Sequence, residues 1–217
     1  MDVELKNQLI RAFIFLAISA GVCAIAWYKR FFTLPKRASV PVLWYQLLIA
    51  ISMYLGAIFF LSPTYILFLK RFFTNKVGLT CFAHLFTTGS LSLILIYYTI
   101  SQKLFTIKTN LWKNILIGAS SWIIIFPLTL FISQLLDIFN LVIFNITEVP
   151  DQIAIRFLKQ TLDHPTYFFA ATVSIVIFAP IIEELLFRGF LQNYLKRKAG
   201  YRAAILLAAL AFALIHL

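Results

Sequence analysis

Charged residues are scarce in this chain, and their scarcity excludes most classes of soluble protein. Only 12% of the 217 residues are charged, against about 25% in a typical soluble domain. Apolar residues make up 62%, which is more than a water-soluble particle of this size can bury under a polar surface. The net charge of +11 therefore does not indicate a nucleic-acid partner. Anionic lipid headgroups at a membrane surface explain it instead.

Cysteine is equally scarce. The two cysteines, Cys23 and Cys81, lie inside separate apolar runs, and neither belongs to a Cys-x-x-Cys pair. This pattern excludes a disulfide framework and a cysteine-based zinc knuckle. Both side chains are expected to serve as small apolar packing groups.

Long apolar runs are what the chain has in abundance. A helix crosses a bilayer with roughly 20 mainly apolar residues, and the runs suffice for about six such spans. We therefore predict an all-α, multi-pass transmembrane helix bundle that forms a single transmembrane domain over residues 1–217. The expected spans are Arg11–Tyr28, Leu43–Leu61 or on to Leu69, Gly78–Ile100, Leu111–Leu136, a fifth from Tyr167 that is interrupted at Pro180, and Tyr201–Leu217.

Two adjacent acids, Glu183 and Glu184, interrupt the apolar character of the fifth span, and Arg188 follows them. An ionised side chain at mid-membrane costs about 2.5–3.5 kcal/mol on insertion scales, so such residues indicate a site by default. Glu184 and Arg188 are spaced i,i+4 with the acid first, the better order for an ion pair. Glu183 points about 100° away from Glu184 on a helix.

These spacings lead to specific expectations. A helix that restarts at Pro180 places both acids in its first turn, where unpaired N–H groups favour anions. We predict that Glu183, Glu184 and Arg188 lie inside the bundle, with Glu184 paired to Arg188. The residues alone leave three interpretations open: a structural Glu–Arg pair, solvated acids at a headgroup boundary, and a catalytic pair with one structural acid and one general base.

The next helix supplies a possible partner for these acids. Phe212 and His216 are spaced i,i+4, and a short basic turn around Gly200 joins this helix to the preceding one. The two helices should therefore be antiparallel neighbours. A carboxylate and an imidazole that face each other across a helix pair can hold and activate a water molecule, so we predict that His216 faces Glu183.

These residues together resemble a known family. The C-terminal segment, residues 179–217, is similar to the first two motifs of the type II CAAX prenyl proteases and bacteriocin-processing proteins, also called the CPBP or Abi intramembrane proteases. The resemblance is carried by Ala179-Pro180-Ile181-Ile182-Glu183-Glu184-Leu185-Leu186-Phe187-Arg188-Gly189 and by Phe212-x-x-x-His216.

The resemblance implies the role of each motif residue. Glu183 would be the base that activates the hydrolytic water, and His216 would help to position that water. Glu184, Arg188 and Phe212 would support the site. The family has been described both as metalloproteases and as metal-free glutamate proteases, and both mechanisms stay open. If the site uses a divalent metal such as zinc, Glu183 and His216 are the residues named as its ligands.

The implied function is that of an intramembrane endopeptidase of the CAAX-protease or bacteriocin-processing type. A glutamate-activated water would hydrolyse a peptide bond of a peptide or protein substrate, either to process the C-terminus of prenylated proteins or in peptide immunity. The implied location is the lipid bilayer of the cell membrane, here the bacterial inner membrane, which the chain would cross several times.

One feature departs from the family pattern. The third motif, a histidine followed four positions later by Asn, lies two helices beyond the second motif, and no such pair occurs up to Leu217. Of the other histidines, His84 is followed four positions on by Thr88, and His164 by Phe168. We therefore expect this chain to lack the last helices of the family fold and to be inactive as a peptidase.

Two alternative functions stay open at this point. The chain could be a non-catalytic or truncated member of the same fold that acts as a membrane interaction or immunity protein. It could also be a small proton-coupled transporter in which the Glu–Glu–Arg group relays protons. Transporters of that kind typically show inverted repeats or paired broken helices, and the sequence suggests one broken helix.

Overall fold

The computed structural model describes residues 3–31, 41–104, 111–144 and 152–215. Every regular element in these residues is helical, which confirms the all-α prediction. Within them, five helical segments are long and apolar enough to cross a membrane. They are Leu5–Tyr28, Trp44–Leu69, Lys76–Ser101, Trp112–Phe144 and Pro165–Ile215.

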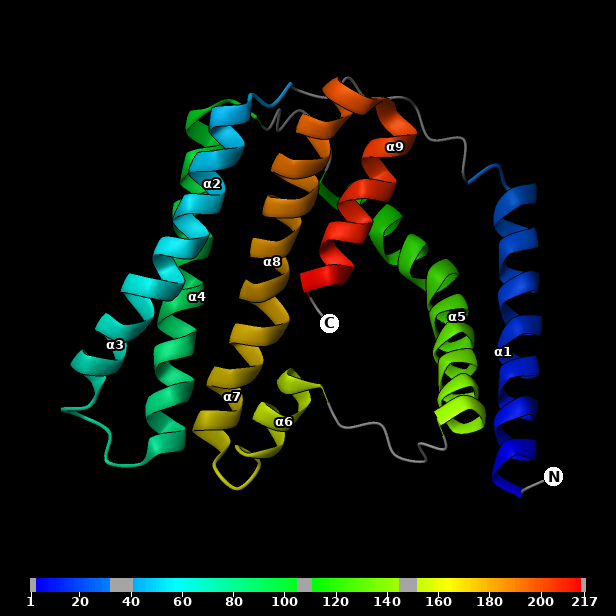
Figure 1. Ribbon diagram of the computed structural model, residues 1–217, viewed down its shortest axis with the longest axis horizontal. Helices are drawn as coiled ribbons and strands as arrows, with labels where there is room; N and C mark the ends of the chain where they lie inside the picture. The colour runs from blue at the N-terminus through cyan, green and yellow to red at the C-terminus, as the bar shows by residue number, and fades with distance from the viewer. Residues whose placement is uncertain (1–2, 32–40, 105–110, 145–151, 216–217) are drawn as a thin grey trace. The chain divides into compact units, whose positions relative to one another are not determined.

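The last of these segments is divided by a sharp turn. At Gly200 the backbone adopts φ 79° and ψ 172°, a left-handed conformation that glycine adopts at no steric cost. The helix on either side of Gly200 therefore forms two arms (Figure 1). The described residues thus contain five candidate spans where about six were predicted, because the expected fifth and sixth spans lie within one segment that turns at Gly200.

The chain divides into two compact units. Unit 1 contains Met1–Arg37 and Ile107–Pro150, and unit 2 contains Ala38–Thr106 and Asp151–Leu217. The described helices of unit 1 are α1 (Val3–Tyr28) and α5 (Leu111–Phe144).

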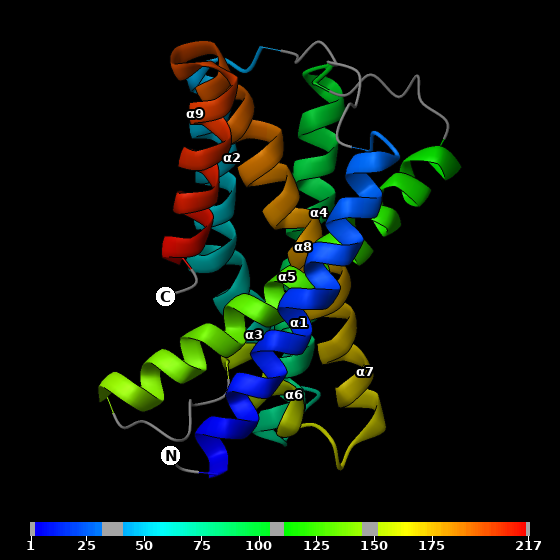
Figure 2. The same ribbon diagram turned by 90° about the vertical axis from the view of Figure 1, so that its right-hand side faces the viewer.

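Helices α1 and α5 lie side by side within unit 1 (Figure 2). The buried residues of α1 include Ala12, Ser19 and Ala26, which are seven positions apart and so share one face. Small side chains at that spacing allow two membrane helices to approach closely. Helix α5 continues as one helix through Pro127.

Unit 2 carries the acidic motif and consists of helices with three π-helical segments, labelled η. In chain order its elements are α2 (Trp44–Gly56), η1 (Ala57–Leu61), α3 (Ser62–Leu69), α4 (Lys76–Ser101), α6 (Ile153–Lys159), α7 (Pro165–Val173), η2 (Ser174–Phe178), α8 (Ala179–Glu183), η3 (Glu184–Leu191) and α9 (Gln192–Ile215).

The helix that carries the motif is continuous through Pro180, so the predicted interruption there is wrong. The flanking residues Phe178 and Glu184 both have right-handed helical backbone angles. Proline lacks an N–H and its ring crowds the carbonyl four residues earlier, but the wider turn of η2 directly before it relieves the crowding. Because no new helix starts here, the acids do not lie among unpaired N–H groups: the N–H of Glu184 donates to the carbonyls of Pro180 and Ile181.

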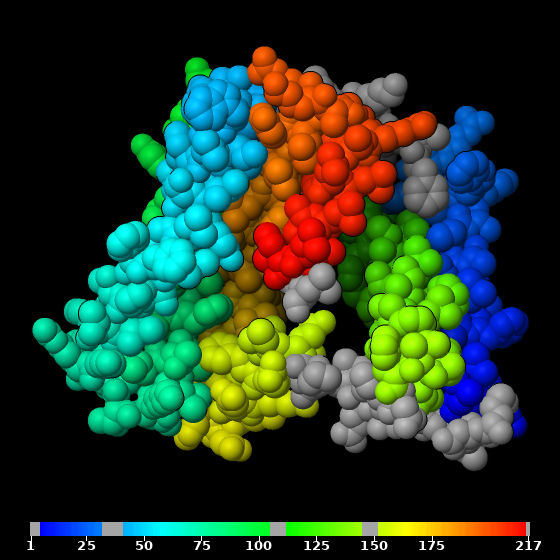
Figure 3. Space-filling view, in the orientation of Figure 1, coloured from blue at the N-terminus to red at the C-terminus, as the bar shows by residue number. Residues whose placement is uncertain are grey.

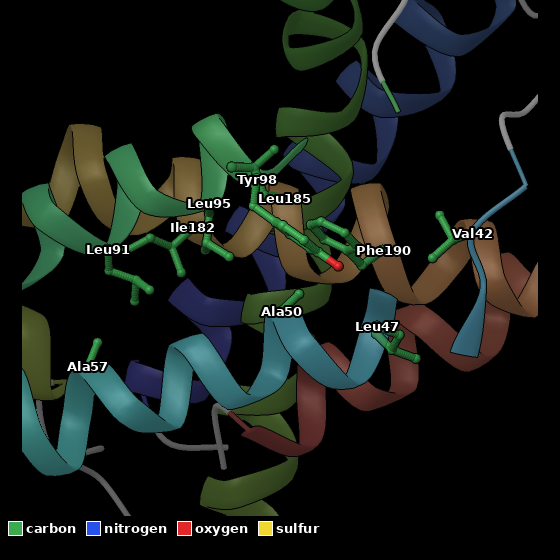
Figure 4. Packing of buried hydrophobic residues seen from close by; sticks show 10 residues of the cluster. All are labelled: Val42, Leu47, Ala50, Ala57, Leu91, Leu95, Tyr98, Ile182, Leu185 and Phe190. Atoms are coloured by element: carbon green, nitrogen blue, oxygen red, sulfur yellow. The ribbon is translucent and has the colours of Figure 1, made fainter. Parts of the chain in front are cut away.

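An apolar cluster fixes the inner face of the motif helix (Figure 4). Phe190 of η3 is fully buried and its ring stacks on that of Tyr98 of α4, with 5.7 Å between the ring centroids. Ile182 and Leu185 are buried on the same face. The cluster consists of Val42, Leu47, Ala50, Ala57, Leu91, Leu95, Tyr98, Ile182, Leu185 and Phe190.

Helix α7, which leads into the motif helix, is held firmly against α4. A Cβ atom added to Gly78 of α4 would lie 2.6 Å from the ring of Tyr167, so a larger residue would require the ring to shift. Cys81 of α4 packs against Ala170 and Ala171 of α7, and all three are buried. The rotation of α7 about its axis is thereby determined by its contacts with α4.

Candidate functional site

The acidic motif lies on a helical hairpin formed by α8, η3 and the second arm of α9. The turn at Gly200 brings this arm back along η3 (Figure 1). Phe187 of η3 and Phe212 of α9 meet edge to face, with 5.2 Å between ring centroids and 85° between ring planes. This contact confirms the prediction that the two helices are antiparallel neighbours.

The predicted ion pair is present. Nη1 of Arg188 lies 3.3 Å from Oε2 of Glu184 and 3.5 Å from Oε1 of the same carboxylate. The expectation that the pair is buried is wrong, because the side chains are 72% exposed for Arg188 and 58% exposed for Glu184. The reason is the apolar cluster, which occupies the inner face of the helix and leaves the charged residues on the open face.

Glu183 is half-buried and borders two grooves. The first, which we call the polar groove because it holds the charged residues of the motif, has a volume of about 560 Å³ and runs between η3 and α9, although most of its lining is apolar. Glu183, Glu184, Arg188 and Gln192 line one wall of it, and α9 forms the other wall. The ion pair thus lies in an open polar channel beside Glu183.

The second groove is apolar and has a volume of about 340 Å³. Its walls come from α2, from η3 and from α9, and Glu183 is the acidic residue that reaches it. In the space-filling view, the surface of α8 is recessed between α2 and α9 (Figure 3). Phe187 lines both grooves, so the pair of aromatic rings separates the polar groove from the apolar one.

This arrangement defines what the site can do chemically. A carboxylate at the border of a polar and an apolar groove can hold a water molecule that enters from the polar side. An extended apolar chain in the other groove would then lie beside that water. Glu184 is engaged with Arg188, whereas Glu183 is the carboxylate that reaches both spaces.

Of the two residues predicted to bind the water, Glu183 is among the described residues and His216 is not. His216 lies outside the described residues, so its predicted position opposite Glu183 stays a prediction. Among the described residues, no group of three or more His, Cys, Asp or Glu side chains comes together to hold a metal ion. Glu183 therefore has no set of described ligands around it from which a metal-dependent step can be derived.

The other two histidines have structural surroundings. His84 of α4 forms a hydrogen bond with Ser174 of η2. His164 precedes α7, and its ring lies 5.0 Å from that of Tyr167. Neither histidine lines the two grooves at Glu183.

The wall that α2 contributes was not predicted from the sequence. Leu47, Ile51, Tyr54 and Leu55 line the apolar groove, although more than 120 positions separate them from Glu183. No local pattern indicates such a contact, because it depends on how distant helices pack. The bond between His84 and Ser174 was also missed, although the polar spacing of His84, Thr88 and Ser92 on an apolar helix is a visible signal.

Comparison with known proteins gives one match. The family model of the type II CAAX prenyl endopeptidases, Rce1-like, matches residues 165–217. This match confirms the resemblance seen in the motif residues and places this segment with a family of membrane proteases. Searches of curated proteins and of solved structures each found no significant match.

Proposed function

We propose that this protein is an intramembrane endopeptidase of the type II CAAX-protease kind, in which Glu183 activates the hydrolytic water. The observation that carries the proposal is the position of Glu183. Its carboxylate borders a polar groove that can admit water and an apolar groove that can admit a substrate chain. It also lies in the segment that matches the protease family.

The proposed reaction is a general-base hydrolysis. Glu183 accepts a proton from a water molecule as the water oxygen attacks the carbonyl carbon of the scissile peptide bond. The tetrahedral intermediate then collapses, the C–N bond breaks, and the proton held by Glu183 passes to the leaving amine. His216 is assigned the positioning of the water, because it occupies the histidine position of the second motif.

The supporting residues have separate tasks in this proposal. The ion pair with Arg188 engages Glu184, and the position of Glu183 at the border of both grooves assigns it the role of the base. Phe212 holds Phe187 at the border of the two grooves. This border keeps the water path distinct from the apolar groove, in which a prenylated or leader peptide segment would lie.

The proposed location is the cell membrane. Five described helical segments are long and apolar enough to cross a bilayer, and the matching family consists of membrane proteases. A substrate would therefore reach the apolar groove from within the bilayer, and water would reach Glu183 through the polar groove.

The test is hydrolysis of quenched fluorescent peptides, with and without a prenyl group, by the purified protein in lipid nanodiscs. The 217-residue chain is assayed beside an extended version that carries, after Leu217, the His-x-x-x-Asn helices of an Rce1-like protein. We expect hydrolysis by the extended version and a loss of about 10²–10⁴-fold on Glu183→Gln, the usual contribution of a general base.

The matched control is Asp137→Asn, which makes the same change from acid to amide on α5, outside the motif. Its rate should equal that of the parent protein. Hydrolysis that survives Glu183→Gln would overturn the role of Glu183, and no hydrolysis by either version would overturn the peptidase. Proton flux into liposomes that depends on Glu183 without hydrolysis would favour the transporter instead.

A further inference from the structure

Helix α4 contacts both ends of the π-helical segment η2, which leads into the acidic motif. Ser174 is the first residue of η2, and its hydroxyl forms hydrogen bonds with Nδ1 of His84 and, at 2.9 Å, with Oγ1 of Thr88. Phe178 is the last residue, and its carbonyl accepts a hydrogen bond from Oγ of Ser92 at 3.3 Å. The three residues of α4 are four positions apart, so they form one polar stripe along the helix.

These hydrogen bonds differ from those of two other buried hydroxyl residues on α4, although Thr88 also donates to the carbonyl of His84 in its own helix. Thr87 and Thr99 are also buried, but each bonds to a carbonyl of its own helix, Ala83 and Leu95 respectively. Ser174 is fully buried, so its hydroxyl depends on protein partners, and loss of those partners would leave a costly unsatisfied group. The stripe on α4 therefore favours the arrangement in which η2 presents Ser174 and the carbonyl of Phe178 to it.

The π-helical form of η2 determines which way each later residue of the same helix faces about the helix axis. A π-helix pairs residue i with residue i+5 and so holds about one residue more per turn than an α-helix. If η2 became α-helical without a change in sequence, each later residue would turn by about 100° relative to α7. Ile182 would then take the place of Glu183, and Leu186 would take the place of Phe187.

Such a change would rotate the elements after η2, which are α8 and η3, because α7 before it is packed against α4. Tyr167 of α7 lies against Gly78 of α4, so closely that a larger residue there would require the ring to shift. The ring of Phe178 also faces Gly89 of α4, where an added Cβ atom would lie 3.4 Å away, an ordinary packing distance. With α7 packed against α4, a change in η2 would turn α8 and η3 against α9 and against the apolar cluster, so the hydrogen bonds to η2 act together with the packing of Ile182, Leu185 and Phe190.

We propose that His84, Thr88 and Ser92 are positioning residues that keep η2 π-helical and thereby aim Glu183 at the border of the two grooves. The consequence for hydrolysis rests on the proposed function. The positioning itself is a property of the fold, and it can be measured without any peptidase activity.

The experiment measures the rotation of η3 by cross-linking. In a protein carrying Cys23→Ala and Cys81→Ala, one sample also carries Phe187→Cys with Phe212→Cys. The other sample carries Leu186→Cys with Phe212→Cys. A short bifunctional thiol reagent is applied in nanodiscs, and the ratio of the two cross-linking yields reports which residue faces α9.

The parent protein should favour the cross-link from position 187. Adding Ser174→Ala and Ser92→Ala removes all three hydrogen bonds to η2. We expect the ratio of the 187–212 yield to the 186–212 yield to fall roughly tenfold. A shift of this size corresponds to the loss of one or two net hydrogen bonds. Restoring the hydroxyl with Ser174→Thr in place of Ser174→Ala should recover most of the original ratio.

The matched control is Thr87→Val, which removes a buried hydroxyl that bonds within α4 and should leave the ratio unchanged. Thermal unfolding and circular dichroism identify the folded samples. If Ser174→Ala with Ser92→Ala does not fold, Ser92→Ala alone is measured, with a smaller shift expected. An unchanged ratio in a folded variant would overturn the positioning role, whatever the outcome of the peptide assay.

Discussion

Two π-helical segments of unit 2 occupy equivalent positions but have different surroundings. Both η1 and η2 are five residues long, and each ends two positions before a proline, Pro63 and Pro180 respectively. Their first residues, Ala57 and Ser174, are both buried. Ala57 packs in the apolar cluster, whereas Ser174 forms hydrogen bonds with two side chains of α4.

The comparison separates what proline requires from what the motif requires. A wider turn precedes proline in both places and accommodates the missing N–H and the bulk of the ring, although Pro127 of α5 lies in an α-helix without such a turn. The first residue of η1, Ala57, packs in apolar surroundings, and the side-chain hydrogen bond to this segment comes from Thr64 of the same helix, whose hydroxyl donates to the carbonyl of Phe60. The hydrogen bonds from α4 are thus an additional feature of η2, the segment that directly precedes the acidic residues.

The largest expected effect comes from exchanging the first residues of the two segments. Ser174→Ala leaves His84 and Thr88 without their shared partner and should lower the free energy of unfolding by about 1–3 kcal/mol. Ala57→Ser adds a hydroxyl that can bond to a carbonyl of its own helix, so its cost should stay below about 1 kcal/mol. Denaturant titration in detergent measures both, and equal losses would remove the distinction between the segments.

A smaller effect is expected from the aromatic pair that follows each proline. Phe187 meets Phe212 after Pro180, and Phe86 meets Tyr65 after Pro63, with ring centroids 5.2 Å and 5.8 Å apart. Phe187→Ala and Phe86→Ala should each lose the pair energy of about 0.5–1.5 kcal/mol in addition to apolar contact. In the peptide assay only Phe187→Ala should lower turnover, and a comparable loss with Phe86→Ala would show that the two regions act together.

Replacing each proline sharpens the comparison further. Pro63→Ala restores an N–H that can bond within the helix, and the described hydrogen bond from α4 to this helix, between Ser90 and Tyr65, lies after η1 and not at its ends. Cross-linking between cysteines introduced by Tyr65→Cys and Phe86→Cys should therefore fall by roughly two- to fivefold, the effect of one hydrogen bond of about 0.5–1 kcal/mol.

Pro180→Ala should instead leave the cross-link between positions 187 and 212 unchanged, because α4 still holds η2 through Ser174 and Phe178. Equal responses at the two prolines would mean that proline alone decides the conformation of both segments.

The smallest effect is expected for the ion pair that distinguishes the motif side. Glu184 and Arg188 are both more than half exposed in an open groove, and exposed pairs contribute about 0–1 kcal/mol. A double-mutant cycle with Glu184→Gln and Arg188→Ala measures this term. A coupling of about 3–5 kcal/mol would instead show a buried pair, as the sequence suggested.

Much of the fold was predictable, because the relevant information is local. Apolar runs located the helices, and the i,i+4 spacing of Glu184 and Arg188 predicted their contact. Gly200 predicted the turn that places Phe212 beside η3. The interruption at Pro180 was predicted wrongly because the rule for proline in α-helices ignores a π-helical turn before it. The burial of the ion pair was predicted wrongly because the apolar cluster, and not the charge, decides which face of the helix turns inward.

The sequence by itself determined that the chain is helical, apolar enough for a membrane, and equipped with an acidic motif on a helical hairpin. These properties depend on residues within one or two turns of each other. Only the tertiary structure decided that α2 forms a wall of the apolar groove and that Glu183 borders both grooves. It alone also decided that a polar stripe on α4 contacts both ends of η2. The physical reason is that the rotation of a helix is fixed by its neighbours, which are distant in sequence.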